Sequence, residues 1–471
     1  MRNTINGSPA GPGEGLDVID PATLEYIDRV GRCGRAEVDA ACQAAAAAGP
    51  KWARSETDRQ RAMLACAEIL AVYEDELARL LTREQGKPLA QAYQEMRGNA
   101  RLLHWYATLD HPDTVLRDTA EELVVATNRP VGVVAIITPW NFPITILAMK
   151  LWAALLAGNT VVVKPAPTTP LATLRLAELL SQVLPAGVVN TVTGGAETGS
   201  LLTRHPLVGK ISFTGSTASG RSVMEAAAPT LKRLTLELGG NDPAVLLDDA
   251  DLDAVLPAVL RGAFYNAGQV CQAIKRVYVP TAMRDEAVAR LVALADTGFV
   301  VGHGLQPAVT MGPVNNAAQK QRVTGLVADA GARGALIQPV GEMRHDLPGH
   351  FVQPVIVSRI GAAAPLVTEE QFGPALPVVA YDDIDEVVDG LNAGPYGLDA
   401  SVWSADADRA VTIAARLKVG QAYVNTHAGP PEPDVPFGGV KASGFGRELG
   451  IRGLEEVSEL RVLRVARAVT A

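Results

Sequence analysis

The feature that most limits the fold is a regular alternation of short apolar runs and helical segments between residues 132 and 214. Gly132 to Ile137 is a β-branched apolar run, typical of a parallel strand that is buried on both faces. The helix after it begins near Pro143, which fits a first helical turn, and ends before Gly158. Further strands are expected over Thr160 to Lys164, Val188 to Val192 and Lys210 to Thr214, with a helix over Leu171 to Leu184. This alternation predicts βαβ units and an α/β doubly wound sheet.

A second α/β unit is expected from Lys275 onward. Its strands are predicted over Arg276 to Val279, Gln353 to Val357, Leu376 to Tyr381, Ala400 to Trp403 and Ala422 to Asn425, and its helices over Asp385 to Leu391 and Asp406 to Arg416. The N-terminal part favours helices over Glu37 to Ala48, Glu56 to Thr82 and Ala90 to Leu109, with charged faces that we expect to be solvated. A chain of 471 residues with 48% hydrophobic content is long enough for two or three domains.

Charge and cysteine usage exclude several classes of protein. A net charge of -9 gives no general attraction to nucleic acid or to anionic membranes. The four cysteines are scattered without zinc-like spacing, so neither a disulfide scaffold nor a metal site is expected. The longest apolar run, Ile144 to Ala157, contains Lys150 and is too short to cross a bilayer. Met1 to Gly15 is polar and reads as a loose tail without a secretion segment, so we expect a cytoplasmic protein.

Four motifs stand in a fixed order along the chain. They are Ile136-Ile137-Thr138-Pro139-Trp140-Asn141-Phe142-Pro143, Leu236-Glu237-Leu238-Gly239-Gly240-Asn241, Gly268-Gln269-Val270-Cys271 and Glu369-Glu370-Gln371-Phe372-Gly373-Pro374. Together they resemble the signatures of the aldehyde dehydrogenase superfamily, the non-phosphorylating enzymes that oxidise aldehydes to acids with NAD or NADP. The resemblance runs from about Asp17 to about Leu463, and the separation of 34 residues between Glu237 and Cys271 matches the family's spacing.

Cys271 is the candidate nucleophile. A lone cysteine is more often a small buried apolar residue, but its place among these motifs reverses that preference. A hydride leaves an aldehyde only after a nucleophile has made the carbonyl carbon tetrahedral, so Cys271 would form a thiohemiacetal and then a thioester. The neighbouring Lys275 and Arg276 are expected to lower the pKa of the thiol.

Two further residues would complete the catalytic set. Asn141 offers a neutral amide donor to the oxyanion, together with the Cys271 backbone N–H; its alternative role is to cap the helix that begins at Pro143. Glu237 lies between leucines, so burial would raise its pKa and suit it to activate the hydrolytic water. Its alternative role is a salt bridge at the end of a strand.

The cofactor contacts rest mostly on the resemblance. Small residues where a strand meets a helix let a backbone approach a pyrophosphate, although most such turns bind nothing. The resemblance implies that Lys164 contacts the adenine ribose, that Trp140 and Phe372 lie beside the nicotinamide, and that Glu370 holds its ribose. The expected cofactor residues are Ile137, Thr138, Pro139, Trp140, Lys164, Pro167, Gly195, Gly199, Phe213, Thr214, Gly215, Ser216, Ser219, Leu238, Gly239, Glu370 and Phe372.

Pro167 departs from the family pattern. Many NAD-preferring members have a glutamate three residues after the lysine equivalent to Lys164, where it accepts hydrogen bonds from the ribose hydroxyls. Proline offers no acceptor and no charge to repel a 2′-phosphate. We therefore expect NAD as the cofactor with NADP also accepted.

The expected substrate channel has apolar walls. By family position it contains Thr145, Ile146, Met149, Val270, Gln272, His427 and Phe437. The loop from His427 to Phe437 contains Glu432 and Asp434 but no lysine or arginine, so a carboxylate-bearing aldehyde would lack a cationic partner. A neutral aliphatic or aromatic aldehyde is therefore favoured, with an amino aldehyde as the runner-up.

Two other readings use the same fold. A coenzyme-A-acylating dehydrogenase would capture the thioester with a thiol, but such members generally lack the equivalent of Glu237. A catalytically silent binding or structural protein need not keep Asn141, Glu237, Cys271 and Glu370 together, as this chain does. Both alternatives are therefore less favoured.

The resemblance also divides the chain. Residues 1–115 and 131–239 are expected to form a Rossmann-like NAD(P)-binding domain, and residues 240–455 a second α/β catalytic domain. Residues 116–130 and 456–471, with strands near Glu122 to Thr127 and Leu460 to Val465, are expected to form a small β oligomerisation arm. Family members use this arm to pair with a neighbouring subunit, so a homodimer or homotetramer is expected.

Overall fold

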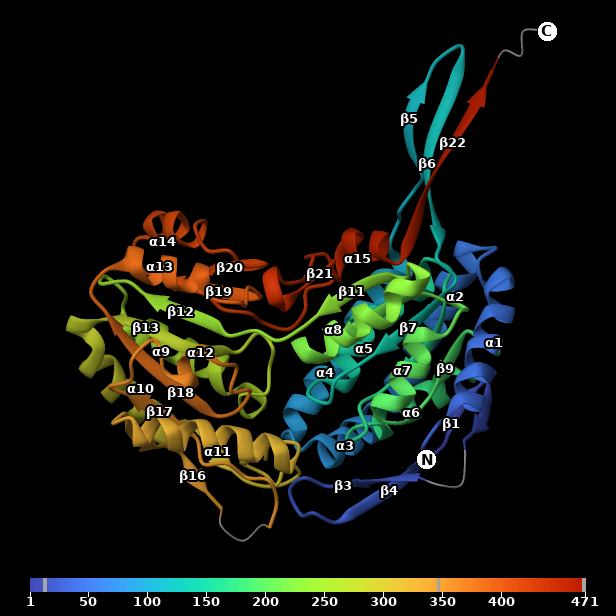
Figure 1. The fold of residues 1–471 in the computed structure, drawn as a ribbon. Coiled ribbons are helices and arrows are strands. Elements are labelled where there is room, and N and C mark those ends of the chain that lie inside the picture. The colour runs from blue at the N-terminus through green and yellow to red at the C-terminus, as the bar shows by residue number, and fades with distance from the viewer. Residues whose placement is uncertain (12–14, 345–347, 468–471) are drawn as a thin grey trace.

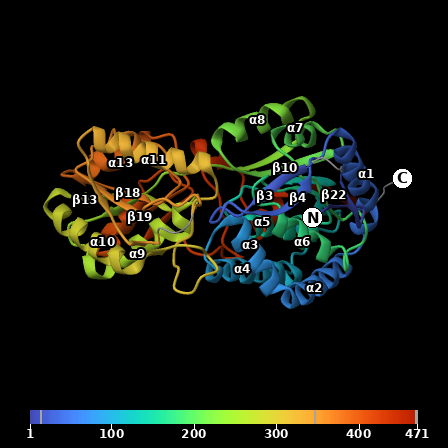
Figure 2. The same cartoon turned by 90° about the horizontal axis from the view of Figure 1, so that it is seen from below.

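The structure, a computed structural model, describes residues 1–11, 15–344 and 348–467. Residues 468–471 of the expected arm and part of the expected tail lie outside these ranges. Two parallel-rich sheets form two bodies beside each other (Figures 1 and 2). A slender three-stranded sheet projects from one of them (Figure 1). The α/β fold class that the sequence predicted is confirmed. Among the described residues, no helix is long and apolar enough to span a membrane.

The first sheet has six strands. Their order is β21 (Gly444–Phe445), β11 (Arg233–Glu237), β10 (Val208–Thr214), β7 (Val133–Ile137), β8 (Thr160–Lys164) and β9 (Val189–Thr191). Helices α5 (Pro143–Leu156) and α6 (Leu171–Leu180) pack against one face, where Val134 and Ile136 point. Helices α1 (Arg35–Trp52), α7 (Ala196–Arg204) and α8 (Thr217–Ala227) pack against the other, where Val133 and Ala135 point. Because both faces are covered, these strands read as continuous apolar runs.

The second sheet has seven strands. Their order is β15 (Leu336–Pro339), β17 (Val355–Ser358), β18 (Ala375–Tyr381), β13 (Ile274–Pro280), β12 (Asp242–Leu246), β19 (Asp399–Trp403) and β20 (Gln421–Val424). Helices α9 (Leu252–Phe264) and α10 (Arg284–Gly298) cover one face, and α11 (Ala317–Ala332), α12 (Pro365–Thr368), α13 (Ile384–Ala393) and α14 (Ala407–Ala414) cover the other. The sequence analysis missed β12, which lies at the centre of this sheet.

The N-terminal helices differ from expectation in one place. The expected helix over Glu56 to Thr82 is two helices, α2 (Glu56–Val72) and α3 (Glu74–Gln85), separated at Tyr73. Helix α4 (Leu89–Thr108) follows after Gly86, whose φ of 101° ends α3 in the left-handed region. These helices pack on the face of the first sheet that α5 covers.

The N-terminal tail is not loose. Strand β1 (Asn3–Ile5) pairs with β2 (Ser8–Ala10), and β3 (Gly15–Ile19) pairs with β4 (Tyr26–Gly31). Asn3 is buried and donates from Nδ2 to Thr193 Oγ1 at 2.8 Å. A polar composition misled the prediction here because these polar groups find partners on the first sheet. A further short pair is formed by β14 (Val300–Val301) with β16 (Glu342–Met343).

The projecting sheet has the strand order β22 (Ser458–Ala466), β6 (Glu122–Pro130) and β5 (Thr114–Asp118). Both neighbours run antiparallel to β6, and β22 pairs with it from Ser458 to Ala466. The sheet stands away from both bodies in Figure 1. Its two expected strands therefore pair within one chain, and β5 is an addition that the sequence analysis did not place.

Candidate active site

Cys271 follows a loop with an unusual backbone. The loop joins α9 to β13, and within it Asn266, Ala267 and Gly268 have φ values of 49°, 55° and 73°. A Cβ on Gly268 would lie 2.4 Å from the Gly373 carbonyl oxygen, so only glycine fits. Gln269 fixes the loop because its buried amide donates to Asn266 O at 2.9 Å and accepts from Asn315 N at 2.8 Å. The loop therefore presents a half-buried Cys271 from a fixed backbone.

Asn141 lies between β7 and α5 and reaches the cysteine loop. Its Nδ2 donates to Gln269 O at 3.0 Å, which leaves the second amide hydrogen free for another acceptor. Phe142, not Asn141, occupies the N-cap position of α5, so the capping alternative is wrong. Asn141 thus joins the loop of the first sheet to the loop that carries the cysteine.

A buried ion pair that the sequence analysis missed supports Asn141. Lys87 Nζ donates to Glu95 Oε2 at 2.6 Å and to the Asn141 carbonyl at 2.9 Å. Glu95 Oε1 accepts from Ile144 N and Thr145 N at 2.8 and 2.9 Å, and so caps α5. Both side chains are buried, so the expectation that the charged faces of these helices are solvated is wrong here. The sequence signal for this contact was that α5 has no polar side chain at its N-cap position, so its first N–H groups need an acceptor from elsewhere in the chain.

Glu237 lies at the end of β11 with little exposure. Neither carboxylate oxygen has a hydrogen-bond partner among the described residues. The backbone of Gly438 lies close to this carboxylate, since a Cβ on Gly438 would lie 2.8 Å from Glu237 Oε1. Burial, followed by repulsion from Glu448, raises the pKa of Glu237 well above its usual value. The expectation of a raised pKa agrees with this arrangement, and Glu237 makes no salt bridge among the described residues.

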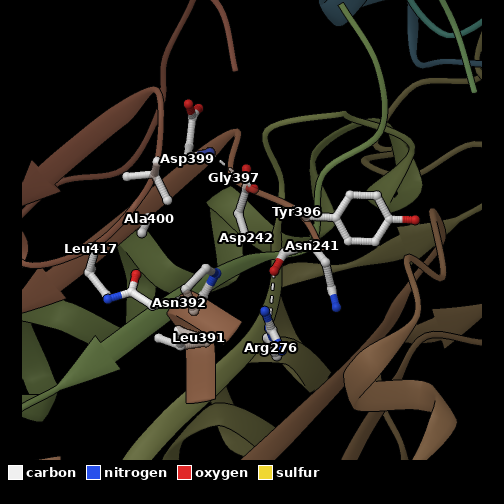
Figure 3. A pocket seen from close by; sticks show the side chains of 12 residues that line it. Asn241, Asp242, Arg276, Leu391, Asn392, Tyr396, Gly397, Asp399, Ala400 and Leu417 are labelled. Carbon is white, nitrogen blue, oxygen red and sulfur yellow. Dashed lines mark hydrogen bonds between the residues drawn. The ribbon is translucent and has the colours of Figure 1, made fainter. Parts of the chain in front are cut away.

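The expectation of a lowered pKa for Cys271 is wrong. Burial raises the pKa of this thiol, and the nearby carboxyls Asp399 and Asp242 raise it further, while Lys275 opposes them. Asp399 donates its backbone N–H to Asp242 Oδ1 at 3.1 Å beside a small cavity of about 10 Å³ (Figure 3). Burial raises the pKa of Asp242 to about 8. These surroundings favour the thiol form of Cys271, which a base would have to deprotonate before the sulfur attacks.

The expected cofactor residues meet along the carboxyl ends of β7, β8, β10 and β11. Ile137, Lys164, Thr214 and Glu237 end these four parallel strands; Ile137 pairs with Lys164, and Thr214 pairs with Glu237. Ser216 caps α8 by accepting from Ser219 N at 3.2 Å, and Gly195 occupies the N-cap position of α7. Pro167 is exposed in the turn after β8.

These residues fit a dinucleotide. A Cβ on Gly199 would lie 3.6 Å from Lys164 Cε, so the lysine lies against the start of α7. Glu370 Oε1 accepts from Gly240 N at 3.1 Å, and a Cβ on Gly239 would lie 2.4 Å from Glu370 Oε2. The rings of Trp140 and Phe372 meet edge to face at 5.5 Å. The buried Oγ1 atoms of Thr138 and Thr214 have no protein partner among the described residues and remain available to a ligand.

A large pocket of about 750 Å³ contains Cys271 and Glu237. All seven expected channel residues line it, namely Thr145, Ile146, Met149, Val270, Gln272, His427 and Phe437. His427 is neutral there, because burial lowers its pKa to about 4. Its Nε2 donates to Gln272 O at 2.9 Å and its Nδ1 lies 2.9 Å from Ser401 Oγ, so it fixes the backbone beside the cysteine.

The channel is not free of cations. Of the two acids in the closing loop, Glu432 lines the pocket and Asp434 does not. Arg97 and Arg101 of α4 and Arg261 of α9 also line it. The sequence analysis considered only the loop from His427 to Phe437, and these helices come from elsewhere in the chain. The expectation that a carboxylate would lack a cationic partner is therefore wrong.

A cysteine and a buried carboxyl that share one pocket, beside a cradle suited to a dinucleotide, define the class of aldehyde-oxidising dehydrogenases. The chain belongs to the aldehyde dehydrogenase family, whose sequence model it matches over residues 9–463. Members of this family oxidise an aldehyde to a carboxylic acid. The recognition made from the four motifs is confirmed.

Relatives resemble the chain over almost its whole length. The 3-sulfolactaldehyde dehydrogenase of Pseudomonas putida is 38% identical over 459 residues, covering 96% of this chain and 94% of the relative. The succinate-semialdehyde dehydrogenase (NADP(+)) GabD of Escherichia coli is 39% identical over 468 residues, covering 98% and 96%. The solved NAD+ complex of an aldehyde dehydrogenase from Bacillus cereus has a TM-score of 0.94 at 33% identity, covering 99% and 96%.

Proposed function

We propose that this chain is a hydrolytic aldehyde dehydrogenase with Cys271 as nucleophile and Glu237 as general base. The observation that carries the proposal is that both side chains line one pocket, with the backbone of the cysteine loop fixed by Gln269. The carboxyl of Glu237 has no hydrogen-bond partner in the part of the chain that the structure describes, which supports water, not a second thiol, as the group that releases the product.

The residues act in the following order. The Cys271 thiol loses its proton to Glu237 or to water, and the sulfur adds to the aldehyde carbon to form a thiohemiacetal. Asn141 Nδ2, through its free hydrogen, and the Cys271 backbone N–H donate to the oxyanion. NAD or NADP supplies the hydride acceptor when bound. Loss of the hydride leaves a thioester, which a water deprotonated by Glu237 hydrolyses to the acid and the free thiol.

We propose NAD as the preferred cofactor, with NADP also accepted. Lys164, Glu370, Trp140 and Phe372 would hold it, in the cradle completed by the glycines and serines before α7 and α8. Pro167 is exposed and offers neither an acceptor for the ribose hydroxyls nor a charge against a 2′-phosphate. The relatives support both cofactors, since one is named for NADP(+) and another was solved with NAD+.

We also propose the expected domain division and a homodimer or homotetramer. Separate hydrophobic clusters cover the two sheets and support two α/β domains. Residues 444–456 nonetheless contact the first domain, through β21 and through α15 (Gly450–Glu456), which packs on α5. The four free cysteines are consistent with a reducing, cytoplasmic environment.

The test of the proposed function is Cys271→Ala, with Cys66→Ala as the matched control. Cys66 is buried in the core away from the pocket. Reduction of NAD is followed with a panel of aldehydes. Cys271→Ala should abolish dehydrogenase and esterase activity without loss of NAD binding, whereas Cys66→Ala should remain active. Turnover by Cys271→Ala above background in both assays would contradict the assignment.

A further inference from the structure

The pocket that contains Cys271 changes character along its length. Its inner walls are apolar and buried, with Ile146 and Met149 of α5 each less than a tenth exposed. The arginines that line it, Arg97, Arg101 and Arg261, are exposed. The pocket therefore has apolar side chains on part of its inner wall and basic side chains at its mouth.

Helix α4 gives the direction of this change. Glu95 lies at the inner end, where it caps α5 beside Asn141. Arg101 lies six residues further along the same helix, about 9 Å away at roughly 1.5 Å per residue. The buried Gly98 lies between them, and a Cβ there would stand 4.0 Å from Arg101 Nη2. The Arg101 guanidinium thus lies beside this glycine.

Helix α9 places a second arginine opposite the first. Tyr265 lies just after α9 and donates its hydroxyl to Gln94 Oε1 of α4 at 2.7 Å, which ties the two walls together. Arg261 lies one helical turn before Tyr265, on the same side of the helix. The small residues Ala258 and Gly262 line the pocket beside it. The two helices therefore frame one opening.

The charge balance at this opening is positive. Arg97 is paired with Glu74 at 3.1 Å, but Arg101 and Arg261 make no ion pair among the described residues. Two of the pocket's buried acids, Glu95 and Glu448, pair with Lys87 and Lys150. Burial raises the pKa of the third, Glu237, which favours its neutral form. Glu432 is the one exposed acid among the described lining residues. Two unpaired arginines therefore stand against one carboxylate.

We propose that the substrate is an aldehyde with an apolar body and an anionic group, a carboxylate or sulfonate, at its far end. This proposal rests on the proposed function. The aldehyde group meets Cys271, and the body of the substrate lies against Ile146 and Met149. Arg101 and Arg261 bind the anion. A short substrate such as succinic semialdehyde would leave its carboxylate among the apolar inner walls, so it is a poor substrate. A long ω-oxo acid reaches the arginines.

The test compares ω-oxo acids of increasing length with their methyl esters, which have the same body and no charge. We expect kcat/KM for the acids to rise with length, and the longer acids to exceed their esters about fivefold to tenfold, which two exposed charge pairs can give together. This ratio should fall as NaCl is added, because salt screens exposed charges. Acids and esters within twofold of each other at every length would overturn the proposal.

Two variants assign the effect to the arginines. Arg101→Gln and Arg261→Gln should each lower kcat/KM for the long acids and leave the esters unchanged. Arg54→Gln, an exposed arginine outside the pocket, is the control and should change neither. An equal loss for acids and esters in both pocket variants would contradict the proposal. Failure of every aldehyde with the unmodified enzyme would instead contradict the proposed function.

Discussion

At Glu237 burial raises the pKa of the carboxyl, so its ionised form is a stronger base than an ordinary glutamate. Glu237→Gln retains the shape but cannot accept a proton. We expect the first turnover to give a burst of reduced cofactor and later turnovers to slow at least tenfold. Rapid-quench or stopped-flow kinetics separates the two phases. Glu68→Gln, on an exposed residue of α2 outside the pocket, should change neither phase, and a lost burst with normal thioester hydrolysis would reverse the roles.

The same carboxyl predicts the pH dependence. Burial raises the pKa of Glu237 and of the Cys271 thiol, so both are protonated at low pH and become active as pH rises. The rate of turnover should therefore increase with pH along an acidic limb that lies above the ordinary range of a glutamate. In Glu237→Gln this limb should shift or disappear. An unchanged limb in the variant would show that another group titrates.

Pro167 is the residue at which cofactor choice can be tested. A glutamate there would accept from the ribose hydroxyls and repel a 2′-phosphate. Pro167→Glu should therefore raise the ratio of kcat/KM for NAD over NADP about tenfold, equal to about 1.4 kcal/mol. Because Pro167 is exposed, the variant should fold normally. An unchanged ratio would show that selectivity lies elsewhere.

At the scale of elements, the start of α5 depends on a buried ion pair. Glu95→Gln would leave Lys87 buried without its counter-charge, which costs about 3 kcal/mol or more. The melting temperature should fall clearly in calorimetry, and activity should fall as well, because Lys87 also binds the Asn141 carbonyl. Glu74→Gln removes an exposed partner of Arg97 and should cost less than about 1 kcal/mol. Equal losses in the two variants would refute the distinction.

The sequence predicted the strands whose apolar character is local. Val133–Ile137 and Thr160–Lys164 are buried on both faces, so their β-branched runs identify them without tertiary information. Strand Asp242–Leu246 begins with an acid and a proline, so it was missed although it lies at the centre of its sheet. Helix α2 was merged with α3 because the break at Tyr73 has neither glycine nor proline.

At the scale of the whole molecule, the motifs predicted which residues come together. They did not predict the charges and the burial around each of those residues. The seven channel residues indeed line the pocket with Cys271 and Glu237. The pKa of Cys271 could not be inferred, because Asp242 and Asp399 come from two different strands of the folded sheet. The arginines at the mouth were equally hidden, since α4 and α9 are far apart in sequence and are joined in the fold by the hydrogen bond between Tyr265 and Gln94.

In a single chain, the projecting sheet exposes apolar side chains and an open strand edge. Leu460, Val462, Leu463 and Val465 on β22 and Val115 and Leu116 on β5 are all more than 40% exposed. In the described residues β22 pairs only with β6, so its outer edge is open. Open apolar edge strands readily pair with another chain. Both features support assembly through this sheet.

Light scattering should therefore give a mass of two or four times 49.4 kDa. The paired change Val462→Glu and Leu463→Glu places a charge on each face of β22 and should shift the mass toward the monomer at low micromolar concentration, while its pairing with β6 persists. Val411→Glu, on an exposed apolar residue of α14 far from the arm, is the matched control and should leave the assembly intact. A stable monomer for the unmodified chain would refute assembly, and an unaltered oligomer for the paired variant would place the interface on another surface.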